Sequence, residues 1–168
     1  MRIVYALVLI VVPALAAGAQ QLKDQASLRG LSAIRVQVNL QTDNCTQVTE
    51  SELQTAVELR LRMSAVRVAG ESDTLPLHSA FLRVNVVCMQ ILSKSNNSLG
   101  YTFALNSDVV QWIYTALQKS PGLIGATWAT PINLSATGKD EIRQALRDAV
   151  DEQASEFLNA YLAANPKG

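Results

Sequence analysis

One long amphipathic segment near the carboxyl end of the chain constrains the fold more than any other feature. Residues 140–163 carry an apolar stripe at helical spacing, with charged residues on the remaining faces; the stripe contains Ile142, Leu146, Ala149, Val150, Phe157 and Tyr161. A helix of this length extends about 36 Å, which is enough to cross a whole sheet. We therefore expect a helix that packs lengthwise on a sheet and ends before Asn165-Pro166.

The first strand of that sheet is predicted at residues 34–41, where apolar and polar residues alternate strictly. One side carries Ile34, Val36, Val38 and Leu40, and the other carries Arg35, Gln37, Asn39 and Gln41. Such alternation is typical of a strand with one buried face and one solvated face.

A helix is predicted to follow that strand. Thr49 and Glu52 have the spacing of a capping box, ahead of apolar residues at helical spacing. Residues 57–63 also alternate as a strand would, so the pattern alone leaves both interpretations open. The specific cap and the good helix formers favour a helix that starts near Thr49.

Further strands are predicted at residues 65–68, 81–92, 101–114 and 123–129. The order strand, helix, strand over residues 34–68 predicts a parallel crossover, and the turn-rich loop at 93–100 predicts a hairpin. Within the return strand, Asn106-Ser107-Asp108 predicts a bulge or turn, and Pro121-Gly122 predicts another turn.

Together these elements predict an α+β two-layer sandwich. We expect a mixed, mostly antiparallel sheet of four to six strands with two helices on one face, in the order β-α-β-β-β-β-α. The helices should cover one face of the sheet and leave the other partly open.

The first nineteen residues have the layout of a secretory signal peptide: a basic start, an apolar run and a small-residue cleavage site between Ala19 and Gln20. The apolar run is short for a bilayer span and Pro13 interrupts it, so we expect no stable membrane anchor. No cysteine follows the cleavage site, so no lipobox is expected. The sequence thus predicts a leader at 1–19 and a single periplasmic or secreted domain at 20–168.

The charges exclude some classes of partner. The chain has 14 basic and 14 acidic residues, and Arg2 is the one charged residue of the leader, so the mature domain has a formal charge of −1. Nucleic acids and anionic membranes attract proteins with a basic face or stripe. We therefore expect neither as a partner.

Two cysteines, Cys45 and Cys88, invite a disulfide in an exported chain. The alternative is a pair of unbonded thiols. We favour a structural disulfide, which would stabilise the fold by roughly 3 to 4 kcal/mol. No Cys-x-x-Cys spacing suggests a redox role.

Residues with catalytic chemistry are sparse. His78 is the only histidine, which leaves a Ser-His pair open but excludes a two-imidazole metal site within one chain. No Gly-x-Ser-x-Gly motif is present, and most acidic residues lie on the last predicted helix among basic ones. We accordingly predict no catalytic, cofactor-binding or metal-binding residue and no cofactor.

The polar side of the predicted sheet is the candidate binding face, with Arg35, Gln37, Asn39, Arg83 and Asn85. An ordinary solvated face gives the same pattern. Our leading hypothesis is a non-catalytic exported domain that binds a macromolecular partner or a small polar ligand through this face. The alternatives are a small exported hydrolase whose site is assembled by the fold, and a structural or self-associating envelope component. Sequence does not indicate the oligomeric state.

Four segments resemble small exported bacterial proteins of uncharacterised function, across nearly all of the mature chain: Val57-Glu58-Leu59-Arg60-Leu61-Arg62, Asn85-Val86-Val87, Ala126-Thr127-Trp128, and Phe157-Leu158-Asn159-Ala160-Tyr161 with the residues up to Lys167. The resemblance implies a periplasmic or secreted single domain with no known activity. The order of the elements is also similar to the TolB amino-terminal domain.

Overall fold

The computed structural model describes residues 25–76, 78–113 and 123–166. The predicted leader, its cleavage site at Ala19 and Gln20, and the predicted turn at Pro121-Gly122 lie outside these residues. The elements are, in chain order, η1 (Gln25–Leu28), β1 (Ala33–Asp43), α1 (Glu50–Met63), β2 (Ser79–Leu92), β3 (Ser98–Ile113), β4 (Leu123–Ala129), β5 (Asn133–Thr137) and α2 (Ile142–Ala164).

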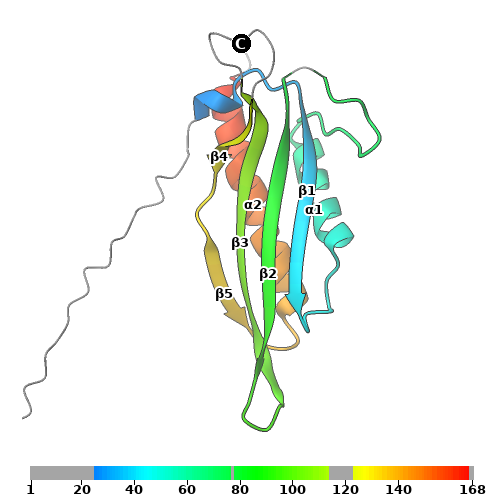
Figure 1. Cartoon of the computed structure of the whole chain (residues 1–168), viewed down its shortest axis with the longest axis vertical. Helices are drawn as coiled ribbons and strands as arrows, with labels where there is room; N and C mark the ends of the chain where they lie inside the picture. Colours follow the sequence, from blue (N-terminus) through cyan, green and yellow to red (C-terminus); the bar gives the residue numbers. More distant parts are fainter. Residues whose placement is uncertain (1–24, 77, 114–122, 167–168) are drawn as a thin grey trace, which may run out of the picture.

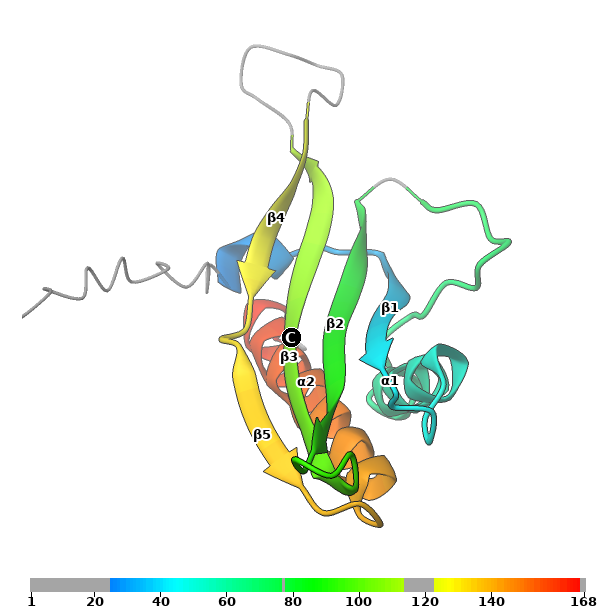
Figure 2. The same cartoon turned by 60° about the horizontal axis from the view of Figure 1, so that its bottom comes forward.

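The five strands form one mixed sheet in the order β1-β2-β3-β4, with β5 also paired to β3 (Figure 1). The pair β1–β2 is parallel, and the other pairs are antiparallel. Both helices lie on the same face of the sheet, as the turned view also shows (Figure 2). The predicted α+β two-layer fold and its β-α-β-β-β-β-α order are confirmed.

The helix α1 begins where the cap predicted it. Thr49 is the N-cap residue, and its hydroxyl oxygen accepts a hydrogen bond from the Glu52 amide at 3.3 Å. Leu53, Val57 and Leu61 form the buried stripe of this helix. The alternative of a strand over residues 57–63 is therefore wrong.

The core lies between the helices and the covered face of the sheet. Phe157 of α2 is fully buried and packs edge-on against Trp128 of β4, with ring centroids 5.6 Å apart. Fully burying a large apolar side chain stabilises the fold by about 1.5 to 3 kcal/mol. The remaining large, fully buried side chains include Tyr101, Leu28, Ile34, Leu53, Leu61, Leu82, Leu105, Ile142 and Leu146.

A charged cluster joins the two helices at the surface. The Glu52 carboxylate of α1 accepts a hydrogen bond from Arg143 Nε at 2.9 Å and also pairs with Arg147, both on α2. The hydrogen bond from Arg143, together with the positive charges of Arg143 and Arg147, lowers the pKa of Glu52 below its ordinary value.

The predicted disulfide is present. Cys45, in the loop after β1, is bonded to Cys88 of β2, with Cα atoms 6.0 Å apart. Both cysteines are buried. The bond ties the start of the β1–α1–β2 crossover to the strand at which the crossover ends.

Two local predictions differ from the structure. Residues 65–68 do not form a strand: Val68 alone makes a parallel bridge, to Ile34, and the crossover from β1 ends in β2 instead. Ala65 has a φ of 61°, in the turn that follows α1, so little extended backbone remains there.

The expected bulge at 106–108 is also absent, because β3 pairs with β2 without interruption there. The irregularity lies slightly later, between Val109 and Val110, in the pairing of β3 with β4. Within the part of the chain that the structure describes, no helix is long and apolar enough to cross a membrane.

Candidate binding face

The face of the sheet opposite the helices is the candidate functional site, and strand register determines its make-up. In β1, β2 and β3, successive side chains alternate between the covered and the open face. Residues directly opposite each other in the register share a face, so the open face can be read as rows across the strands. Polar side chains fill the rows in its middle, and the rows towards both ends mix apolar side chains with polar ones.

Two polar rows form what we call the polar band: Gln37, Arg83 and Asp108 in one row, and Asn39, Asn85 and Asn106 in the next. In the first row, the Arg83 guanidinium donates two hydrogen bonds to the Asp108 carboxylate, one of them from Nε at 3.1 Å. These bonds raise the pKa of Arg83 above its ordinary value. Such a bidentate pair fixes both side chains in one geometry.

The second row is held by amide groups. Asn39 Nδ2 donates to Asn85 Oδ1 at 2.9 Å, and Gln37 Nε2 lies 3.5 Å from Asn39 Oδ1. Asn106 stands opposite Asn85 on β3. The polar band therefore presents a pre-ordered set of amide donors and acceptors beside one ion pair.

In the lower part of the open face, β2 and β5 expose apolar side chains, in rows that also contain Gln41 of β1 and Thr102 of β3. Val87 and Ile91 are each 38% exposed and Met89 is 48% exposed, all on β2, while Leu134 of β5 is 74% exposed. Leu134 stands opposite Ala104, which stands opposite Val87, so these side chains share one face. We call Val87, Met89, Ile91 and Leu134 the apolar cluster.

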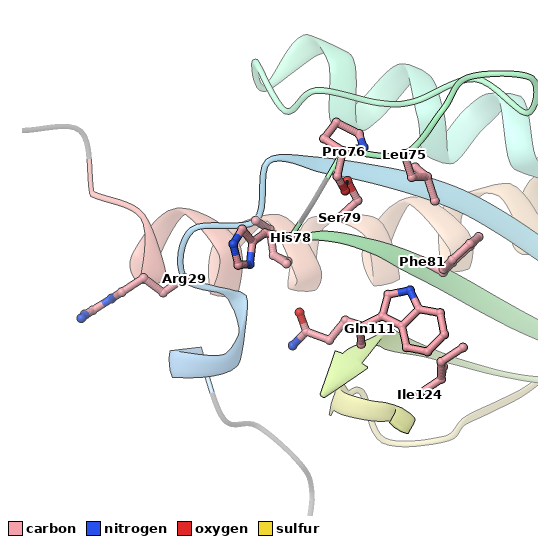
Figure 3. Close-up of a pocket in the computed structure, with 10 residues that line it drawn as sticks. Arg29, Leu75, Pro76, His78, Ser79, Phe81, Gln111 and Ile124 are labelled. Carbon is pink, nitrogen blue, oxygen red and sulfur yellow. Dashed lines mark hydrogen bonds between the residues drawn. The ribbon is translucent and has the colours of Figure 1, made fainter. Parts of the chain in front are cut away.

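The upper end of the open face leads into a cavity of about 460 Å³ (Figure 3). It is lined by Arg29, Leu31, Leu75, Pro76, His78, Ser79, Phe81, Gln111, Trp112 and Ile124. Figure 3 shows the Arg29 side chain pointing away from Phe81, so its guanidinium lies at the rim. Most of the lining residues that the sheet contributes are apolar: Phe81, Trp112 and Ile124.

This cavity brings a serine and the single histidine together. The Ser79 hydroxyl donates a hydrogen bond to the Pro76 carbonyl oxygen at 2.8 Å. The described residues that line the cavity include no carboxylate. Among the described residues, no group of three or more His, Cys, Asp or Glu side chains could hold a metal ion.

All five residues predicted for the binding face lie on the open side of the sheet. Arg83, Gln37, Asn39 and Asn85 belong to the polar band. Arg35 lies over the ring of Phe81, 5.8 Å from its centroid, and donates to the Asp73 carbonyl oxygen. Their role in binding stays a prediction.

Sequence reasoning missed two members of the polar band, Asn106 and Asp108. Their side chains lie in the segment that turn-forming residues marked as irregular. The available signal was the single carboxylate at position 108, since a strand beside Arg83 favours an opposite charge across the pair. The exposed apolar cluster was also missed, because Val87, Met89 and Ile91 read as ordinary strand residues.

No family model and no curated protein matches the chain. Among solved structures, it is similar to rare lipoprotein B from Shewanella oneidensis, with 14% identity and a TM-score of 0.40, over 76% of this chain and 94% of that chain. A putative neuraminyllactose-binding hemagglutinin homolog from Helicobacter pylori is similar at 14% identity and a TM-score of 0.44, over 76% and 80%. A minor lipoprotein from Acinetobacter baumannii is similar at 14% identity and a TM-score of 0.38, over 80% and 93%.

At TM-scores below 0.5, these similarities carry no argument about function. The likeness to the TolB amino-terminal domain stays a prediction from element order. The functional argument therefore rests on the open face itself.

Proposed function

We propose that this protein is an exported, non-catalytic binding domain that docks onto a partner protein with the open face of its sheet. The observation that carries the proposal is the apolar cluster beside the polar band. The part of the chain that the structure describes places no helix over this face, although it places two on the other (Figure 2).

The apolar cluster supports docking because exposed apolar side chains that adjoin one another mark interaction sites more often than scattered ones do. Val87, Met89 and Ile91 follow one another on the open face of β2, and Leu134 of β5 lies in the row of Val87, on the far side of Ala104 of β3. A partner that covered them would gain roughly 25 cal/mol for each Å² of apolar surface removed from water.

The polar band supplies specificity. Five of its six side chains, all but Asn106, take part in the hydrogen bonds described above, so a partner meets a largely fixed pattern of amides and an ion pair. A face that combines an apolar region with a polar region fits a protein surface better than a small polar ligand, which binds in a concave site. We therefore favour the macromolecular partner of the two ligand classes predicted from the sequence.

The disulfide supports the exported location. Bonds such as Cys45–Cys88 form and persist in oxidising compartments, including the periplasm and the extracellular medium. This agrees with the predicted leader at residues 1–19 and with a mature domain that begins near Gln20.

The test replaces two members of the apolar cluster by charged residues. Met89→Asp with Leu134→Asp should leave the fold intact, since both side chains are exposed, and should abolish recovery of partners from an envelope extract of the source organism. The matched control is Leu59→Asp with Met63→Asp, two exposed apolar residues on α1.

The proposal predicts that the control variant recovers the same partners as the wild type. Equal recovery by the Met89/Leu134 variant, with circular dichroism showing native structure in both, would contradict docking through the open face.

A further inference from the structure

We propose that the cavity at the upper end of the open face binds a small molecule with a flat apolar body and one negative charge, such as an aryl carboxylate. The cavity volume is about 460 Å³, within the range of about 300 to 1,000 Å³ that is usual for small-molecule sites. This inference goes beyond the docking of a partner protein and does not depend on it.

Aromatic and aliphatic side chains form one end of the cavity. Phe81 stands opposite Val110 in the register and Trp112 lies two residues further along β3, so the two rings are diagonal neighbours on the open face. Ile124 of β4 stands opposite Trp112. Trp112 is 50% exposed and Ile124 is 59% exposed, so a ligand in the cavity would remove apolar surface of both from water. Aromatic rings stack on flat apolar molecules, which fits this end to the body of the ligand.

Positive charge lies at the other end. Figure 3 shows Arg29 and His78 across the cavity from Phe81 and Ile124. No carboxylate is among the described residues of the lining, so the charge of Arg29 is not offset there. Clefts lined by charge of one sign concentrate ions of the opposite sign. The lining therefore favours an anion over a cation of the same shape.

The walls of the cavity are held in place before a ligand arrives. The side-chain nitrogen of Gln111 donates to the Ser27 carbonyl oxygen at 3.0 Å and to Thr127 Oγ1 at 2.8 Å. The segment that leads into β2 is fixed as well, because the Ser32 amide donates to the His78 carbonyl oxygen at 3.0 Å. A preformed site loses little free energy in ordering its own groups, which favours the binding of a small molecule.

The test titrates the ¹⁵N-labelled protein with 2-naphthoate, a flat aromatic anion. The indole N–H of Trp112 is the reporter, and that of Trp128, which is 1% exposed, is the internal reference. We expect saturable shifts of the Trp112 signal with a Kd of about 1 mM or below. The cation 2-naphthylmethylammonium has the same ring system and the opposite charge, and it should bind at least about fivefold more weakly.

Matched variants locate the binding site. Ile124→Asp places a carboxylate in the lining and should weaken 2-naphthoate binding at least about tenfold. Its control is Ile132→Asp, at an exposed residue outside the lining, which should bind like the wild type. Arg29→Gln should weaken binding about two- to fivefold, and Arg67→Gln, at an exposed residue outside the lining, should leave it unchanged.

The cavity is distinct from the apolar cluster, since Phe81 and Met89 lie about 26 Å apart along β2. The Met89/Leu134 variant of the docking test should therefore bind 2-naphthoate like the wild type, so failure of either proposal leaves the other standing. Circular dichroism checks that each variant keeps its fold. Three results would overturn the cavity proposal: no saturable Trp112 shift up to about 10 mM 2-naphthoate, equal binding of the cation, or undiminished binding in Ile124→Asp.

Discussion

The two faces of the sheet are built from the same strands, yet one face is buried under the helices and the other is exposed to solvent. On the covered face, Leu82, Val84 and Val86 of β2 lie under the helices and are almost completely buried. On the open face of the same strand, Arg83 and Asn85 form a polar band, and Val87 and Met89 stay in contact with solvent. The alternation of one strand therefore supplies both a core and a recognition surface.

This difference separates the residues whose identity is constrained by core packing from those whose identity is not. Covered-face side chains are selected by volume, because cavities and excess volume both destabilise a close-packed core. Open-face side chains contribute little to that packing. An exposed methionine or leucine there contributes little to stability, and a group of such residues on one face favours a binding role.

The largest expected effect separates the two faces by stability. Phe157→Ala, at a fully buried side chain that packs on Trp128, should lower the free energy of unfolding by about 3 to 5 kcal/mol. Met89→Ala on the open face should change it by less than about 0.5 kcal/mol. Urea denaturation of both variants measures the contrast, and equal losses would refute the assignment of the faces.

The disulfide is the next largest contribution. Replacing Cys45 and Cys88 by serine should lower the free energy of unfolding by about 3 to 4 kcal/mol, because the unfolded chain regains the freedom of the closed loop. Reduction of the wild type with dithiothreitol should produce a similar loss in urea denaturation. A loss of less than about 1 kcal/mol in both experiments would speak against a structural role.

A buried polar contact tests the covered side more finely. The Thr130 hydroxyl accepts a hydrogen bond from the Ser107 amide at 2.8 Å and donates to the Gln153 side-chain oxygen of α2. Thr130→Val leaves both groups buried without this partner and should lower the free energy of unfolding by about 1 to 3 kcal/mol. Thr137→Val, whose hydroxyl bonds at the surface, is the control and should have little effect.

The smallest effect concerns the surface cluster that joins the helices. Because the pKa of Glu52 is lowered in the folded state, its stabilising contribution is present above the ordinary glutamate pKa and is lost as pH falls through the lowered value. Glu52→Gln should therefore lower the Tm slightly at pH 7, and its Tm should converge with that of the wild type in acid. If the difference in Tm between the variant and the wild type grew as the pH fell, the sign of the expected pH dependence would be wrong.

The sequence predicted the elements whose signals are local. Strict alternation located β1, the Thr49 cap located the start of α1, and the apolar stripe located α2 to within two residues. Features that depend on which strands pair with each other were not predicted. Asp108 stays in a regular strand because Arg83 stands opposite, and Val68 pairs alone because the turn at Ala65 leaves little strand.

The candidate site divides in the same way. Alternation alone placed Arg35, Gln37, Asn39, Arg83 and Asn85 on one face. The same alternation also places Val87 and Met89 on that face, but nothing in their residue types predicted that they stay exposed there. Leu134 belongs to the apolar cluster because β5 pairs with β3, and no local pattern in residues 133–137 predicts that pairing.

Site-specific photo-crosslinking tests the central claim most directly. A benzoyl-phenylalanine at position 89 lies on the open face, and one at position 63 lies on the helix side, where Met63 is more exposed than Met89. In the envelope of the source organism, we predict a discrete protein adduct from position 89 and none from position 63. An adduct from position 63 alone, or none from position 89, would contradict the claim that the open face is the docking surface.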